Sequence, residues 1–223
     1  MIGLIIFDMD GLMIDSERLT MQAYIDMGRE WGLPVTQEQF LNIIGKNSRD
    51  IKNQYRRDFG EDIDADRLYR EIGVLRDRRV REDGIPVKKG LRDLLTMLKV
   101  EASAIPLTVA SGSDEEVINR HLETAGLNHY FTDVLSSRDV PRGKPAPDVF
   151  LSLCERFRVS PEETLVFEDS PNGIRAGLAG NMQVIAVPDI QPVLDDIAGQ
   201  CYAVVPDLAA AIPYVRRLLS SDK

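Results

Sequence analysis

The sequence predicts an α/β protein with a parallel sheet that has helices on both faces, interrupted by an all-helical insertion. Short apolar runs rich in β-branched residues alternate with helical patterns after Pro86, and one such run opens the chain. Between about residues 16 and 85 only helical spacings occur. We therefore expect a core domain of residues 1–15 and 86–223, with a helical cap domain of residues 16–85 inserted into it.

The core elements follow one another in the order strand, helix, strand. The expected strands are the apolar runs at residues 4–7, 107–110, 134–135, 164–167 and 183–187. Helical faces are expected over residues 91–98, 117–125, 150–157 and 208–215. Ser113 and Glu116 have the spacing of a capping box, and Pro171 fits the first turn of a further helix. This alternation predicts a Rossmann-like sheet.

The insertion is expected to be helical because its apolar residues recur at steps of three and four. Leu19, Ala23 and Met27 form one such series, and others run over residues 51–59 and 68–75. Thr36 and Gln39 form a capping box that opens another helix.

Composition bounds the function of the 223-residue chain. Hydrophobic residues make up 43% and charged residues 28%, so a proper core can form and global disorder is excluded. The net charge of −9 argues against a nucleic-acid or membrane partner, although a metal-containing site could still accept an anionic substrate. The chain shows neither a signal peptide nor a membrane-spanning run and has only two cysteines, which favours the cytoplasm. A monomer is the default expectation.

Polar side chains follow the expected strands where parallel sheets bind ligands. They are Asp8 and Asp10 after the first strand, Ser111 and Gly112 after the second, and Glu168 and Asp169 after the fourth, with Lys144 in a Gly-Lys-Pro loop. Four gathered carboxylates raise one another's pKa, and a Mg²⁺ ion, which prefers oxygen ligands and phosphates, would relieve this. One aspartate could then attack phosphorus while another moves the proton.

The same residues resemble a known family. Asp8-Met9-Asp10-Gly11, Ser111, Gly143-Lys144-Pro145 and Glu168-Asp169-Ser170 resemble, in order and spacing, the four motifs of the haloacid dehalogenase-like superfamily. Longer strings at residues 7–17, 144–148 and 168–173 are similar to its β-phosphoglucomutase and sugar-phosphatase branch, and the resemblance covers the whole chain.

The resemblance implies a role for each motif residue. Asp8 would be the nucleophile and Asp10 the general acid and base. Ser111, the backbone of Gly112 and Lys144 would contact the phosphate. Mg²⁺ would be held by Asp8, the Asp10 carbonyl and Asp169, with Glu168 ligating it or orienting a bound water. In the cap, the string Gly45-Lys46-Asn47-Ser48-Arg49 resembles a substrate-contacting loop, so Lys46 and Arg49 are candidate substrate contacts.

Two positions separate the branches of the family. Asp10 favours phosphate esters, because relatives that cleave carbon–halogen bonds or phosphonates lack an aspartate there. Thr20 aligns with a histidine of the mutases, which favours a phosphatase. We therefore expect a Mg²⁺-dependent phosphatase of small phosphorylated metabolites, with sugar phosphates as the expected class. The alternatives are a β-phosphoglucomutase-like mutase and a binding or signalling module that is phosphorylated on aspartate without turnover.

Overall fold

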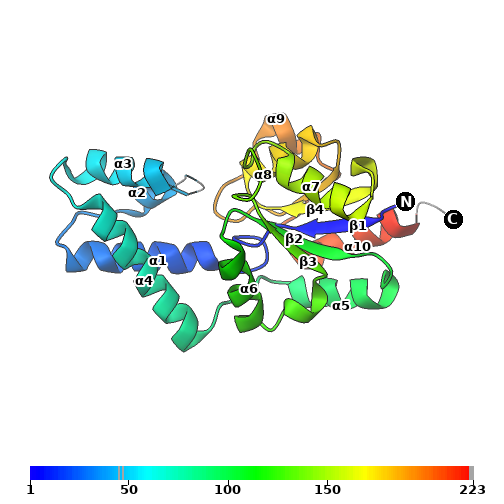
Figure 1. The fold of residues 1–223 in the computed structure, drawn as a ribbon, viewed down its shortest axis with the longest axis horizontal. Helices are drawn as coiled ribbons and strands as arrows, with labels where there is room; N and C mark the ends of the chain where they lie inside the picture. Colours follow the sequence, from blue (N-terminus) through cyan, green and yellow to red (C-terminus); the bar gives the residue numbers. More distant parts are fainter. Residues whose placement is uncertain (45, 47, 221–223) are drawn as a thin grey trace. The chain divides into compact units, whose positions relative to one another are not determined.

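The computed structural model describes residues 1–44, 46 and 48–220. Figure 1 shows the fold of the chain. The described chain divides into two compact units, one made of Met1–Ile14 with Pro86–Lys223 and one made of Asp15–Ile85. The first unit holds the sheet, and the second is helical.

The first unit contains one parallel sheet, with six strands in the part of the chain that the structure describes. They are β1 (Leu4–Phe7), β2 (Leu107–Ser111), β3 (Asp133–Ser136), β4 (Thr164–Glu168), β5 (Gln183–Ala186) and β6 (Ala203–Val204). Their order is β3-β2-β1-β4-β5-β6, and every neighbouring pair is parallel. The predicted α/β fold is therefore confirmed. Only β6 was not predicted, because two residues are too few to leave a pattern.

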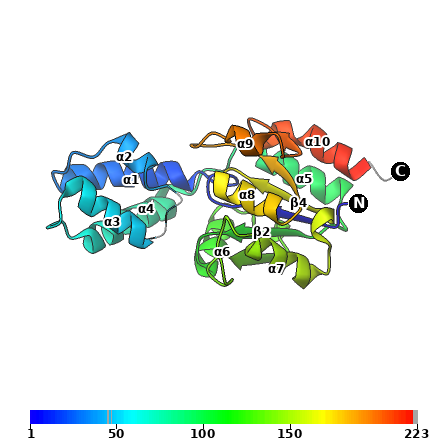
Figure 2. The same cartoon turned by 90° about the horizontal axis from the view of Figure 1, so that it is seen from above.

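Helices cover both faces of the sheet. They are α5 (Leu91–Glu101), α6 (Glu115–Thr124), α7 (Asp148–Phe157), α8 (Pro171–Ala179), α9 (Asp195–Ala198) and α10 (Leu208–Ser220). Helices α7 and α8 lie on one face, while α5 and α10 pack together on the other (Figures 1 and 2). All four residues of β1 are buried, as expected for a central strand covered on both faces.

The position of β1 determines where a ligand site can form. It lies between β2 and β4, so the strand order reverses at this point. The register pairs Phe7 with Val109 on one side and with Phe167 on the other, and the Phe7 and Phe167 rings stack 4.7 Å apart. Ligands of open parallel sheets bind beyond the carboxyl ends of the strands at such a reversal. The residues that follow β1, β2 and β4 therefore share one edge.

The second unit is built from α1 (Ser16–Glu30), α2 (Gln37–Leu41), α3 (Ser48–Phe59) and α4 (Ala65–Asp83). Its own core contains the buried rings of Tyr24, Phe40 and Tyr55. The predicted capping box is confirmed, because the Thr36 side chain accepts from the Gln39 N–H while the Gln39 side chain accepts from the Thr36 N–H. Among the described residues of both units, no helix combines the length and apolar character that a membrane crossing requires.

Candidate active site

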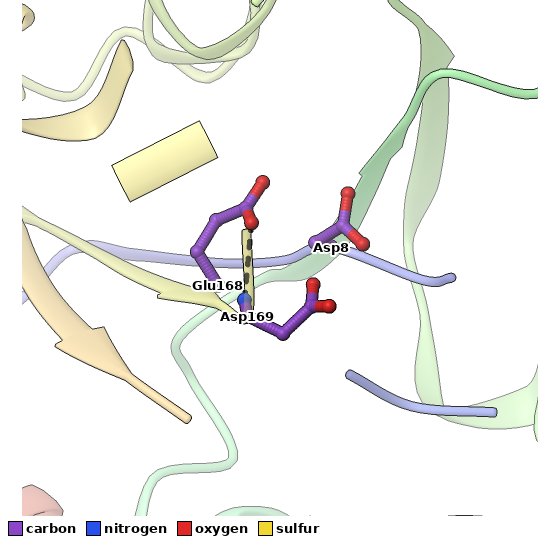
Figure 3. Close-up of side chains that lie close together, drawn as sticks. All are labelled: Asp8, Glu168 and Asp169. Carbon is purple, nitrogen blue, oxygen red and sulfur yellow. Dashed lines mark hydrogen bonds between the residues drawn. The ribbon is translucent and has the colours of Figure 1, made fainter. Parts of the chain in front are cut away.

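The carboxyl ends of β1 and β4 bring three carboxylates together. Asp8 follows β1 directly, Glu168 is the last residue of β4, and Asp169 follows it. One carboxylate oxygen from each lies within 4.8 Å of the others, and all three residues are buried. Figure 3 shows their carboxylate groups side by side. Residues about 160 positions apart thus meet at the strand reversal.

The ammonium group of Lys144 lies between two of these acids. Its Nζ is 2.6 Å from Asp8 Oδ1 and 2.6 Å from Glu168 Oε1, and it also donates to the Ala110 carbonyl at 3.1 Å. The side chain is 11% exposed, and its Nζ lies 5.0 Å from the centre of the Phe150 ring. Lys144 is therefore a buried cation, fixed on several sides.

Glu168 is held from behind by the start of α8. Its Oε2 accepts from the N–H groups of Asp169 and Ser170 at 3.0 and 3.1 Å, and from the Ser170 hydroxyl at 3.0 Å. Ser170 also caps α8, because its hydroxyl accepts from the Gly173 N–H at 3.1 Å. Both oxygens of Glu168 are thus already engaged, one with this turn and one with Lys144, so the geometry makes Glu168 an anchor for the lysine.

Two glycines leave room for the acids. A Cβ at Gly11, whose φ is +88°, would lie 2.3 Å from Asp169 Oδ2. A Cβ at Gly173 would lie 1.7 Å from Glu168 Oε1. Side chains at these positions would displace the carboxylates, so the loop after β1 can approach Asp169, and α8 can approach Glu168, only because both residues are glycine.

Gly173→Ala is expected to lower the free energy of unfolding by about 1–3 kcal/mol, because the new methyl group overlaps a buried carboxylate. Gly73→Ala is the matched control: it lies inside α4 with no atom within 4 Å of the added Cβ, so it should stabilise by about 0.5–1 kcal/mol. Chemical denaturation of both variants measures the difference. Equal effects would contradict the close approach at Gly173.

Asp10 is linked to the end of β2. Its Oδ2 accepts from the hydroxyls of Ser111 and Ser113, each at 2.9 Å. This corrects the predicted capping box. Helix α6 begins at Glu115 after Asp114, and no side-chain capping bond is described at its start. The Ser113 hydroxyl bonds instead to Asp10, 103 residues earlier, an interaction that local spacing cannot reveal.

The electrostatics of the site reflect its burial. Burial raises the pKa of Asp8 well above its ordinary value, and the charges of Glu168 and Asp10 add to this effect, while Lys144 opposes it. Burial by itself would lower the pKa of Lys144, but the charges of Asp8 and Glu168 outweigh it and the pKa is raised. The lysine in the site is therefore protonated, and further positive charge near Asp8 would lower the pKa of its carboxyl group.

The side chains present fit a hard divalent cation. The cluster offers oxygen ligands only, and one oxygen each from Asp8, Glu168 and Asp169 lies within 4.8 Å of the others. A cation there would offset the burial that raises the pKa of Asp8. The donor set and the charge are thus both suitable for Mg²⁺.

The other predicted site residues are placed as follows. Gly112 is exposed between the two serines that hold Asp10. Lys46 and Arg49 belong to the helical unit and are both exposed, and Arg49 lies 3.9 Å from Asp50. Gly45 and Asn47 of the predicted substrate loop lie outside the described residues. The sequence did not reveal that Ser113 bonds to Asp10. It also did not reveal that the lack of a side chain at Gly173 leaves room for the Glu168 carboxylate.

In this parallel sheet the central strand is followed by a buried aspartate, which pairs with a buried lysine beside two more acids. This arrangement defines an α/β enzyme with an acidic centre. The chain belongs to the haloacid dehalogenase-like hydrolase family, whose family model matches residues 5–187. This confirms the resemblance that the four motifs indicate.

Relatives and solved structures agree with this assignment. The fructose-1-phosphate phosphatase YqaB of Escherichia coli is 30% identical over 183 residues, which are 82% of this chain and 95% of that protein. A phosphorylated carbohydrates phosphatase of Thermotoga maritima is 28% identical over 186 residues, 81% of this chain and 82% of that protein. The crystal structure of β-phosphoglucomutase from Clostridium difficile has the same fold, with a TM-score of 0.77 at 19% identity over 99% of this chain and 98% of that one.

Proposed function

We propose that this protein is a Mg²⁺-dependent phosphatase of small phosphorylated metabolites, with sugar phosphates as its substrate class. The observation that carries the proposal is the buried aspartate at the end of β1, held against Lys144 at 2.6 Å beside two further acids. The relatives named as phosphatases of fructose 1-phosphate and of phosphorylated carbohydrates support the substrate class.

The reaction proceeds in two displacements. An Asp8 oxygen attacks phosphorus, the bond from phosphorus to the sugar oxygen breaks, and the Asp10 carboxyl gives its proton to that oxygen. Water then attacks the same phosphorus, its proton passes to the Asp10 carboxylate, and the bond to Asp8 breaks. Free phosphate leaves, and both aspartates return to their starting states.

The remaining residues stabilise the negative charge of the transferring phosphoryl group. Lys144 balances the negative charge on the phosphoryl oxygens from one side. The Ser111 hydroxyl and the Gly112 N–H donate hydrogen bonds to these oxygens from another. Asp8, Asp169 and the Asp10 carbonyl would hold Mg²⁺. Glu168 accepts from Lys144 through Oε1, and the remaining acceptor capacity of its carboxylate would ligate the ion or orient a bound water. When bound, the ion supplies positive charge that keeps Asp8 ionised and offsets charge on the phosphoryl oxygens.

The helical unit is proposed to act as a cap that closes over the substrate, with Lys46 and Arg49 contacting the sugar.

Thr20 in this unit favours water as the final acceptor of the phosphoryl group. Its hydroxyl donates to the Ser16 carbonyl of its own helix at 2.8 Å. A threonine bound in this way offers no imidazole to assist a second phosphoryl transfer, as a mutase would need. A cytoplasmic location, the absence of nucleic-acid and membrane partners, and a monomer are part of this proposal.

A panel of phosphorylated metabolites tests the function directly. We expect inorganic phosphate to be released from sugar phosphates with Mg²⁺, activity to be lost with a chelator, and activity to return when Mg²⁺ is restored. With β-glucose 1-phosphate, a phosphatase gives free phosphate, whereas a mutase gives glucose 6-phosphate. A stable phosphoprotein that releases no phosphate would instead indicate a signalling module and would contradict turnover.

A further inference from the structure

The carboxylate of Asp10 receives hydroxyl donors from two residues of one loop. Ser111, the last residue of β2, and Ser113, two residues later, both donate to Oδ2 at 2.9 Å. The loop is also tied to itself, because the Ser113 N–H donates to Ser111 Oγ at 3.0 Å. The backbone and hydroxyl of Ser113 are therefore fixed together against Asp10.

The two serines cannot serve Asp10 equally during the reaction. Each hydroxyl has one proton to donate. Under the proposed function, Ser111 contacts a phosphoryl oxygen, and a proton directed there is withdrawn from Asp10. The proposed function gives Ser113 no phosphate contact, so its hydroxyl can stay on Oδ2 while substrate is bound.

A donor fixed on Oδ2 also determines the chemistry of the carboxyl group. The hydrogen bonds to Oδ2 limit how the carboxyl group can turn. The side-chain torsions of Asp10 are restrained at the same time. Ser113 thus sets the orientation of the Asp10 carboxyl group.

We propose that Ser113 is a positioning residue, which acts through Asp10 to orient the proton given to the leaving sugar oxygen and taken from the attacking water. The proposal rests on the proposed phosphatase function. A positioning role differs from a direct contact with phosphate in one measurable way. It predicts that the loss of kcat/KM without the Ser113 hydroxyl depends on how much the leaving group needs a proton. A sugar oxygen needs one, whereas p-nitrophenolate is a stable anion that leaves without one.

The test compares two substrates in Ser113→Ala. Since kcat/KM reports the steps up to departure of the leaving group, it isolates the first displacement. For the sugar phosphate that the wild type hydrolyses fastest, we expect kcat/KM to fall by about 10- to 100-fold. For p-nitrophenyl phosphate we expect it to stay within about twofold of wild type, while kcat falls for both substrates because the second displacement still needs Asp10 as a base.

Two variants control this experiment. Ser113→Thr keeps the hydroxyl and should restore kcat/KM for the sugar phosphate to within about threefold of wild type. Ser111→Ala should lower kcat/KM for both substrates, because a phosphoryl contact is needed whatever leaves. Thermal unfolding monitored by circular dichroism shows whether each variant is folded.

The outcomes distinguish failure of the positioning role of Ser113 from failure of the proposed phosphatase function. Equal losses on the two substrates, no loss on either, or no recovery in Ser113→Thr would overturn the positioning role while leaving a phosphatase. A wild-type protein that releases phosphate from neither substrate would overturn the phosphatase and, with it, the role of Ser113.

Discussion

Asp8→Asn should reduce turnover by about 10⁴-fold or more while leaving the protein folded, because an amide oxygen cannot replace the carboxylate as nucleophile. The substitution keeps the size of the side chain. It removes a charge whose burial raises the pKa of Asp8, so the metal-free protein should lose little stability. Steady-state phosphate release and thermal unfolding measure the two effects.

A matched substitution shows that the effect is local. Asp62→Asn makes the same chemical change at an exposed position of the helical unit and should leave both activity and melting temperature unchanged. Turnover by Asp8→Asn within tenfold of wild type would rule out Asp8 as the nucleophile. A melting temperature far below that of wild type would show that the loss of activity has a structural cause.

Lys144→Met should abolish activity and, without metal, lower the free energy of unfolding by about 3–5 kcal/mol at neutral pH. Methionine fills a similar volume against Phe150 but removes the ammonium group that faces Asp8 and Glu168 at 2.6 Å. Two buried carboxylates then lack their cation. Equilibrium denaturation of the metal-free variant measures the loss.

The loss should depend on pH in a defined direction. Lys144 lowers the pKa of Asp8, so its removal raises a pKa that burial already holds above the ordinary value. A carboxyl group whose pKa is raised by folding destabilises above its unfolded pKa of about 3.9, increasingly as pH rises toward its folded pKa. The difference between wild type and Lys144→Met should therefore be larger at pH 7.5 than at pH 5. The raised pKa of Lys144 keeps the wild-type lysine charged throughout this range.

An exposed ion pair provides the control. Lys89 lies 2.7 Å from Asp207, against 2.6 Å for Lys144 and its partners, but the Lys89 side chain is 80% exposed. Lys89→Met should therefore change stability little at any of these pH values, since solvent and salt screen the pair. If both lysine variants behaved alike, burial would not be the source of the effect at Lys144.

The parts of the fold that the sequence predicted are those with a strong local pattern. Buried parallel strands such as β1 read as unbroken apolar runs, and the acids that follow β1 and β4 stand out directly after them. The rule that carboxyl ends of parallel strands share one edge was then enough to gather Asp8, Glu168 and Asp169, whereas Lys144 was singled out by its loop and by the family motif. Their catalytic roles stay predictions until the variants are measured.

The parts that were not predicted depend on contacts between distant residues. Ser113 was predicted to cap α6, because spacing reports only what lies three or four residues away, and its true partner is Asp10. Gly173 gave no signal, because its importance comes from the Glu168 carboxylate packed against it. Neither contact has a periodicity from which it could be inferred.

The central position of β1 also has a consequence for synthesis on the ribosome. Its neighbours begin only at Leu107 and Thr164, so β1 is translated long before the strands that pair with it on both sides. Residues 15–85 make their contacts within one continuous stretch and can fold during that wait. Nascent chains that stop before β4 should therefore carry a folded helical segment, a hydrophobic β1 segment that lacks its β4 partner and can bind chaperones, and no enzymatic activity.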